Sequence, residues 1–143
     1  MIRQKINGDL LEVFPLGAGN EVGRSCVIVK FKGKVVMFDC GIHPAHNGIY
    51  CLPYFDFIEP ESVNLLMITH HHLDHCGALP YFLKHTKFRG KVVMTHATKA
   101  IYKYVLNDYV KICNINKARE DFLYDESDLN ESMKRIDPIT HHW

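Results

Sequence analysis

Residues 65–77 read LLMITHHHLDHCG, an apolar run followed at once by four histidines within six residues. The apolar run is too short for a helix and is bounded by polar residues, which predicts a buried strand. In an extended segment alternate side chains share a face, so His70 and His72 can point at one metal ion. Asp74 and His75 follow closely and can supply a second ion. The pattern H-x-H-x-D-H therefore predicts a metal site at the end of a strand.

The residue types in this cluster favour zinc. Imidazole and carboxylate ligands bind zinc at about 2.0–2.2 Å, and mixed nitrogen and oxygen sets leave room for water. Two ions about 3.5–4 Å apart can activate a shared water and polarise a phosphoryl or carbonyl oxygen. His71 is expected to face the other way and not to be a ligand. Two other origins of the histidine cluster are disfavoured. A tag remnant would be terminal and uninterrupted. A set of core or capping histidines would bury four rings without charge partners, which is unfavourable.

Composition describes a globular chain of 143 residues, which is one small domain or part of a larger one. Apolar residues make up 47% and charged residues 23%, which excludes disordered and fibrous classes. The net charge of +1 excludes nucleic-acid binding by overall charge alone. No apolar run approaches the roughly 20 residues that span a bilayer, and the first residues lack the apolar core of a signal peptide. The 5 cysteines, an odd count without a CxxC motif, favour a reduced intracellular protein.

The hydropathy pattern predicts a mixed α/β architecture, because antiparallel strands are followed by strand–helix units. A long loop with one helical turn around 54–57 is expected between the two groups. The expected strands are 11–16, 26–31, 34–39, 65–69 and 91–95, and the expected helices are 77–84, 97–113 and a last one that carries Leu129, Met133 and Ile136. A tight Lys32-Gly33 turn is expected between the second and third strands.

Two details of the helices are open to test. Apolar residues at 101, 104, 105, 109 and 112 predict the buried face of the 97–113 helix. Asp125 or Ser127 is expected to cap the last helix, which Pro138 stops. The five residues after Pro138 show no closing strand, so we expect the chain to be cut short where the next strand should begin.

Several separate strings resemble one family. The strings THHHLDHCGALPYFL, LGAGNEVGRSC, FDCGIHP, THATKAIY and DYVK are similar to the β-CASP nuclease branch of the metallo-β-lactamase superfamily, over about residues 11–136. The resemblance implies an α/β fold in which residues 1–143 form a partial metallo-β-lactamase domain. This would be the first half of an αββα sandwich, truncated before the second half and before the β-CASP insertion.

The resemblance implies a role for five residues. It makes His70, His72, Asp74 and His75 metal ligands, and Asp39 the acidic residue of the first motif, so that Asp39 and Asp74 are the catalytic carboxylates. The residues alone allow two interpretations of Asp39, which ends an expected strand. Its carboxylate could orient a ligand imidazole through the other ring N–H, or it could simply form a turn.

The family also uses ligands that this sequence does not offer. A later histidine, a later bridging aspartate and the histidines of the β-CASP insertion cannot be placed. His141 and His142 fall before the stretch where the later histidine belongs and are not assigned to it. Three imidazoles and one carboxylate are expected to bind zinc loosely, without a tuned two-zinc centre.

The implied function is a zinc-dependent RNA endonuclease of pre-mRNA 3′-end processing, with two zinc ions in the complete protein. The isolated chain is expected to be inactive. The implied partners are the pre-mRNA substrate and other subunits of the cleavage and polyadenylation complex, including a paralogous metallo-β-lactamase subunit and symplekin. A nuclear location, with no membrane, is implied too. The alternatives are a non-catalytic fragment or scaffold subunit and a small-molecule hydrolase of the same superfamily, acting on a thioester or lactam.

Weaker candidates lie outside the histidine cluster. The glycines of residues 17–23 suggest a phosphate loop, but an expected strand rather than a helix follows, which disfavours nucleotide binding. Asn20 and Glu21 in this segment either border the substrate or belong to a simple glycine turn. Cys76 is expected to pack rather than bind zinc.

For the remaining candidates the structural interpretation is favoured over the functional one. His43 and His46 are expected to be solvated in the long loop rather than to line the cleft, and His96, at a helix start, to be structural rather than close to the site. The tyrosines at 102, 104 and 109 are expected to lie in the core and at its rim rather than to stack on bases. The basic residues at 84, 87, 89 and 91 are expected to form a solvated face rather than to contact RNA.

Overall fold

The computed structural model describes residues 1–116 and 122–141 of the chain. One sheet of seven strands follows the chain order from β1 to β7. The strands are β1 (Ile2–Ile6), β2 (Asp9–Gly17), β3 (Cys26–Phe31), β4 (Lys34–Phe38), β5 (Leu65–Met67), β6 (Lys91–Thr95) and β7 (Ile136–Ile139). The helices are α1 (Leu73–Cys76), α2 (Leu79–His85), α3 (His96–Asn116) and α4 (Glu126–Arg135), with 3-10 turns η1 (Gly48–Cys51), η2 (Phe55–Phe57) and η3 (Pro60–Ser62).

The sheet changes character halfway across. Strands β1 to β4 are antiparallel, whereas β4 to β7 run parallel. This confirms the mixed α/β prediction. The Lys32-Gly33 turn is tight as expected, with φ values of 49° and 73° that match a two-residue hairpin of type I′.

Strand β1 was not predicted, although its turn carries a known signal. Asn7 and Gly8 have φ values of 50° and 89° and join β1 to β2. An Asn-Gly pair between extended segments is a strong hairpin signal. Every residue of β1 is exposed, so the strand lacks the buried alternation that reveals most strands in a sequence.

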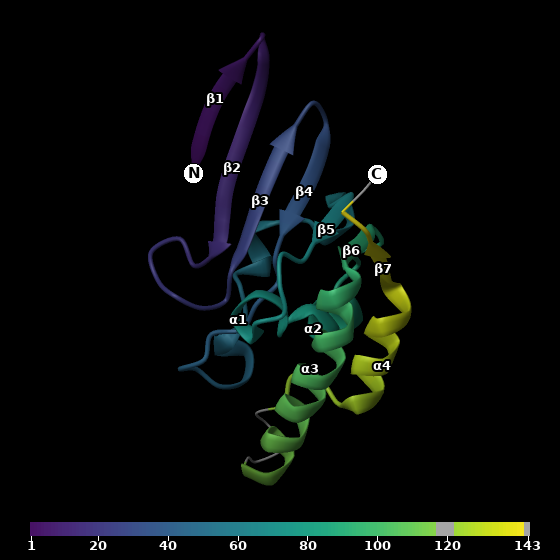
Figure 1. Cartoon of the computed structure of the whole chain (residues 1–143). Helices are drawn as coiled ribbons and strands as arrows, with labels where there is room; N and C mark the ends of the chain where they lie inside the picture. Colours follow the sequence, from purple (N-terminus) through teal and green to yellow (C-terminus); the bar gives the residue numbers. More distant parts are fainter. Residues whose placement is uncertain (117–121, 142–143) are drawn as a thin grey trace.

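One face of the sheet packs against the helices. Figure 1 shows the helices gathered beside β5–β7, while the β1–β2 ribbon projects beyond them. The buried side chains of this core include Ile28, Met37, Leu66, Val92 and Met94 from the strands, and Leu79, Phe82, Tyr102, Leu106 and Leu129 from the helices.

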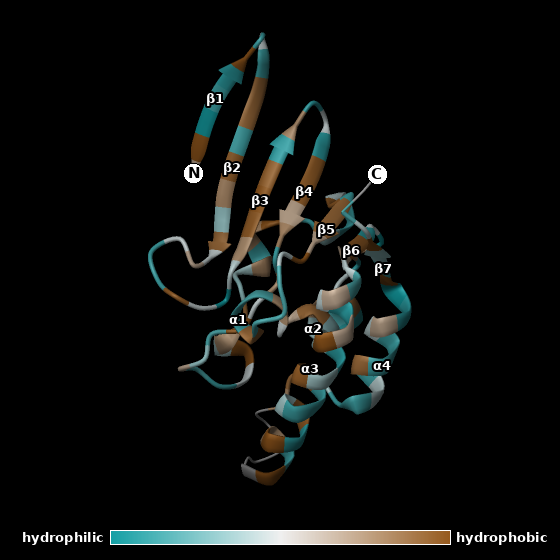
Figure 2. Cartoon of the chain, viewed as in Figure 1, coloured by the Kyte–Doolittle hydropathy of each residue, from teal (hydrophilic) through white to brown (hydrophobic). Residues whose placement is uncertain are grey.

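The other face of the sheet is also apolar but only half-buried. The strand register brings Val29, Val36 and Leu65 into one row across three strands. Val27 and Phe38 begin a second row beside it. Figure 2 shows this apolar character along β3 and β4. Strands that are apolar on both faces are typical of sheets covered on both sides.

For the C-terminal part of the chain, the structure confirms one expectation and contradicts two. Asp125 caps α4, where its side chain accepts from the Asp128 N–H in a capping box, so Asp125 rather than Ser127 is the cap. Ile136 was expected in the helix but begins β7, which pairs with β6. The expectation of no strand after the last helix was therefore wrong. Pro138 is tolerated there because β7 is the last strand of the sheet.

The predicted buried face of α3 was also wrong in part. Ile101, Tyr104 and Ile112 are 41%, 74% and 50% exposed. The helix instead buries Tyr102, Leu106, Val110 and Cys113 against β6, β7 and α4. The sequence alone does not decide between the two, because apolar residues lie on both sides of α3.

Among the described residues, no helix combines the length and apolar character needed to cross a membrane.

Candidate metal centre

The histidine cluster and Asp39 meet at one edge of the sheet. Strands β4 and β5 are parallel neighbours, so the residues that follow them emerge together. Asp39 directly follows β4, and residues 68–72 connect β5 to α1. Crevices at the carboxyl ends of parallel strands are common ligand sites in α/β proteins. The topology thus brings the predicted residues to one place.

The Asp39 carboxylate accepts several hydrogen bonds at this edge. The residue is 5% exposed, and its Oδ1 accepts a hydrogen bond of 2.7 Å from the Thr69 N–H. Its Oδ2 accepts from the Thr69 hydroxyl at 2.9 Å and from His75 Nδ1 at 2.8 Å. Of the two interpretations of Asp39, the structure has the one in which the carboxylate holds an imidazole of the cluster.

The backbone of Asp39 is strained. Its φ of 64° lies in the left-handed region, which costs most residues about 1–2 kcal/mol and is tolerated best by Gly, Asn and Asp. Such strain concentrates at functional sites, where the surrounding contacts hold it in place.

The four predicted ligands form two close pairs. His70 Nε2 lies 3.2 Å from His72 Nδ1, and His75 Nε2 lies 3.5 Å from Asp74 Oδ2. The rings of His70 and His75 are 4.1 Å apart between centroids, so the two pairs adjoin. His70 and His75 are half-buried and His72 is exposed, which leaves the cluster open to a ligand.

The donor chemistry of these pairs fits zinc. In a tetrahedral site with zinc–nitrogen distances of about 2.0 Å, two nitrogens lie about 3.3 Å apart, which is close to the His70–His72 separation. Within the described residues, however, no three His, Cys, Asp or Glu side chains converge on one point as a single ion would require. The described residues present two two-donor sets rather than a completed ligand sphere.

Backbone contacts fix the position of α1. The carbonyls of Leu73, Asp74 and His75 accept hydrogen bonds from the backbone N–H groups of Ile42, Ser25 and Cys40, respectively, at 2.8–3.0 Å. Gly41 lies between two of these donors, and a Cβ at this position would stand 1.6 Å from the Asp74 carbonyl oxygen. Only glycine allows this close approach, so Gly41 sets the placement of Asp74 and His75.

The surroundings favour a neutral His70. Burial, with the charges of His75 and His72 as the next causes, lowers the pKa of His70 below its ordinary value. A metal ligand must be deprotonated, so the lowered pKa keeps His70 available for a metal at neutral pH.

Cys76 packs as predicted. The side chain is fully buried, and burial raises the pKa of its thiol well above the ordinary value. A thiol that resists ionisation is a poor zinc ligand, because the thiolate is the binding form.

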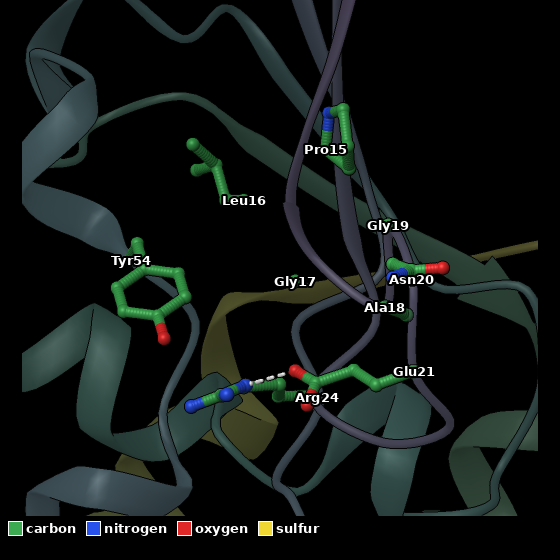
Figure 3. A pocket seen from close by; sticks show the side chains of 9 residues that line it. All are labelled: Pro15, Leu16, Gly17, Ala18, Gly19, Asn20, Glu21, Arg24 and Tyr54. Atoms are coloured by element: carbon green, nitrogen blue, oxygen red, sulfur yellow. Dashed lines mark hydrogen bonds and ion pairs between the residues drawn. The ribbon is translucent and has the colours of Figure 1, made fainter.

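The glycine-rich segment forms a pocket together with Tyr54. Figure 3 shows Arg24 between Glu21 and the ring of Tyr54. The guanidinium carbon of Arg24 lies 4.8 Å from the centroid of this ring. Pocket residues include both Asn20 and Glu21. Strand β3 follows the segment, as expected, whereas a nucleotide-binding motif would be followed by a helix. Since Ser25, the next residue after Arg24, bonds to the Asp74 carbonyl, the pocket wall is tied to α1.

Glu21 also contacts the ring of His43. Glu21 forms an ion pair with Arg24 and approaches His43 Nε2 at 3.5 Å, while the His43 and His46 rings lie 4.3 Å apart. His43 therefore links two loops, and its side chain, only 12% exposed, is not the solvated loop histidine that was expected.

The remaining candidates have varied surroundings. Tyr102 is buried and hydrogen-bonds Ser132, Tyr104 is exposed, and Lys84 contacts Asp128. His96, which begins α3, and His141 are exposed. His142 lies outside the described residues.

Sequence reasoning missed Thr69. It contributes a backbone N–H and a hydroxyl to Asp39, and its hydroxyl lies 2.8 Å from His70 Nδ1. The available signal was its position, since a polar residue between a buried strand and a predicted ligand can bond that ligand.

The comparisons with known proteins agree in their family. Residues 19–142 match the family model described as the Metallo-beta-lactamase superfamily. The chain is 58% identical over 136 residues to cleavage and polyadenylation specificity factor subunit 3-I of Arabidopsis thaliana, covering 95% of this chain and 19% of that protein. It is 52% identical over 134 residues to endoribonuclease ysh1 of Schizosaccharomyces pombe, covering 94% of this chain and 17% of that protein.

A solved structure shares the fold at low identity. The structure, described as a peroxy diiron species of chemotaxis sensor ODP, matches with a TM-score of 0.50 and 14% identity, covering 97% of this chain and 44% of that one. The chain spans about a fifth of the length of the two curated relatives above and corresponds to their N-terminal part.

Proposed function

Because the chain belongs to the metallo-β-lactamase superfamily, we propose that it carries the first metal-binding segment of a zinc-dependent RNA endonuclease that cuts pre-mRNA before polyadenylation. The names of its relatives, a cleavage and polyadenylation specificity factor subunit and an endoribonuclease, support the reaction and the pathway. In this proposal residues 1–143 are the N-terminal half of one metallo-β-lactamase domain.

The observation that carries the proposal is the arrangement around Asp39. One buried carboxylate holds His75 directly, and the neighbouring donors His70, His72 and Asp74 adjoin it at the same sheet edge. Structural packing alone gives no reason to collect three partly or fully exposed imidazoles and the Asp74 carboxylate around the buried Asp39.

The proposed roles follow from the two pairs. His70 and His72 would hold one zinc ion, and Asp74 and His75 would hold the second. Bound zinc supplies a Lewis acid for a phosphoryl oxygen and lowers the pKa of water. Asp39 accepts the Nδ1–H of His75, which keeps the ring in one orientation and leaves Nε2 to bind metal.

The proposed setting follows from the relatives. The substrate would be pre-mRNA, and the partners would be other subunits of the cleavage and polyadenylation complex, including a paralogous metallo-β-lactamase subunit and symplekin. The location would be the nucleus.

A non-catalytic fragment or scaffold remains the second candidate. It is favoured by the two-donor sets, since no described group of three side chains is arranged to hold one ion. This candidate predicts that the isolated chain binds little zinc and cleaves nothing.

Zinc binding by the purified chain is the first test. We expect bound zinc, measured by chelator competition, and a large loss with His72→Ala. His71→Ala is the matched control, because His71 belongs to the same run but is not a proposed ligand. Equal losses in the two variants, or no zinc in the unmodified chain, would contradict the metal site.

Cleavage is tested in the full-length protein. We expect Asp74→Ala combined with His75→Ala to abolish cutting of an RNA that contains a polyadenylation site. Retained cleavage would disprove the catalytic proposal, and activity on a thioester but not on RNA would favour a small-molecule hydrolase.

A further inference from the structure

We propose that Thr69 is a positioning residue that holds His70 in the tautomer with its proton on Nδ1, so that the Nε2 lone pair is available to a metal. The inference rests on the proposed function for its metal, but the hydrogen-bond arrangement can be measured without metal. Thr69 would act through His70 and would not itself touch the ion.

The direction of the Thr69 hydroxyl follows from the chemistry of its two partners. Oγ1 lies 2.9 Å from Asp39 Oδ2 and 2.8 Å from His70 Nδ1. An ionised carboxylate can only accept, so the hydroxyl proton belongs to the bond with Asp39. The hydroxyl has no second proton, so it must accept from His70, and His70 Nδ1 must carry an N–H.

The Asp39 carboxylate therefore orients two imidazole rings. His75 donates its Nδ1–H to Asp39 directly at 2.8 Å, whereas His70 donates through the Thr69 hydroxyl. Both rings are left with an unprotonated Nε2. His70 Nε2 is the atom that lies 3.2 Å from His72 Nδ1, a spacing suited to two nitrogens on one zinc ion. The nitrogen that Thr69 leaves unprotonated is thus the one facing the second proposed ligand.

The hydroxyl can be separated from the packing of Thr69. The residue is exposed, so replacing it with the similarly shaped valine opens no cavity. Its backbone N–H donates to Asp39 Oδ1 at 2.7 Å, and this bond persists with any side chain except proline. Thr69→Val consequently removes the link to His70 while leaving the anchor of the backbone in place.

The tautomer of His70 is measured by nitrogen-15 NMR of the zinc-free 143-residue chain at about pH 8, above the ordinary histidine pKa. In the unmodified chain we expect His70 to be protonated at Nδ1, as His75 is. In Thr69→Val we expect the protonated Nε2 form to gain population for His70 but not for His75. Thr69→Ser keeps a hydroxyl and should restore the Nδ1–H form.

Zinc affinity provides the second readout. Loss of a hydrogen-bond partner behind a histidine ligand lowers metal affinity about 10–100-fold. We expect a loss in this range for Thr69→Val and little loss for Thr69→Ser. Thr86→Val is the matched control, because it removes a hydroxyl that bonds the Phe82 carbonyl at the end of α2, away from the cluster.

The outcomes separate this inference from the proposed function. A His70 protonated at Nε2 in the unmodified chain would overturn the inference, whether or not the variants fold. An unchanged tautomer in Thr69→Val would overturn it too. The Nδ1–H form in a chain that binds no zinc would support the role of Thr69 and contradict the metal site.

Discussion

Asp39 combines two properties that can be tested apart, a strained backbone and a charge. Asparagine adopts the left-handed conformation about as readily as aspartate, so Asp39→Asn should keep the fold at a φ of 64°. The variant lacks the charge that attracts the His75 Nδ1–H and the Thr69 hydroxyl. We expect zinc affinity to fall about 10–100-fold while the melting temperature changes little.

Chelator competition and thermal melting measure the two effects. Asp39→Ala is the comparison, because it loses the charge and also places a residue that disfavours positive φ in a strained position. It should reduce both affinity and stability. An Asp39→Asn chain with full zinc affinity would show that the carboxylate is only structural.

Gly41 transmits the position of β4 to α1 by close contact. Gly41→Ala would place a Cβ 1.6 Å from the Asp74 carbonyl oxygen, so the backbone between the two segments must move. We expect a loss of about 1–3 kcal/mol in the free energy of unfolding, typical of overpacking, together with weaker zinc binding. Urea unfolding and chelator competition measure the two quantities.

Gly33→Ala is the control for this prediction. Gly33 has a φ of 73°, and a Cβ added there would meet no atom within 4 Å, so alanine is strained but clashes with nothing. It should lower stability and leave zinc affinity unchanged. If both variants weakened zinc binding equally, the contact between Gly41 and Asp74 would not be what positions the site.

At the scale of elements, the ion pair between α2 and α4 predicts a pH dependence. Lys84 Nζ lies 2.9 Å from Asp128 Oδ2. Burial raises the pKa of Asp128, but hydrogen bonds from Lys84 and the Asp125 N–H outweigh it, so the net pKa lies below the ordinary value of 3.8. A carboxyl whose pKa is lowered on folding stabilises the fold above its unfolded pKa and loses this contribution as the pH falls through the folded pKa.

We therefore expect Lys84→Met to be less stable than the unmodified chain at neutral pH, with the difference shrinking as the pH drops below 3.8. Urea unfolding at several pH values measures it. Lys134→Met is the control, since the Lys134–Glu131 pair lies within α4 and both side chains are largely exposed. A difference that stays constant down to acid pH would rule out the ion pair as its cause.

The elements also show which sequence signals were sufficient. The β-branched content of β3 and β4 and the cap at Asp125 predicted these elements because local chemistry determines them. Strand β7 was missed because Ile136 continues the apolar spacing of the preceding helix, and only pairing with β6 reveals its extended backbone.

The site likewise has contacts that the sequence predicted and contacts that it did not. The H-x-H-x-D-H spacing predicted which residues adjoin, since they are close in sequence. Contacts between distant segments were not predictable, such as Thr69 with Asp39 or Gly41 with Asp74, because they depend on how β4 and β5 pair.

For the whole molecule, the two faces of the sheet differ in what covers them. The helices bury Val92 completely, whereas Val36 on the opposite face is only half-buried. A strand that is apolar on both sides usually belongs to a sheet with two covered faces. The relatives of the chain are about five times longer, so additional chain is available in them to cover the second face.

The same substitution on each face tests this difference in the isolated chain. Val92→Thr buries a hydroxyl in the core and should cost about 1–3 kcal/mol of unfolding free energy. Val36→Thr exposes its hydroxyl to water, so it should cost less and should reduce the binding of a hydrophobic dye. Threonine has nearly the same shape and strand preference as valine, so neither packing volume nor propensity separates the variants. Urea unfolding and dye fluorescence measure both effects, and equal costs would mean that the Val36 face is covered in solution, which sedimentation would then reveal as self-association.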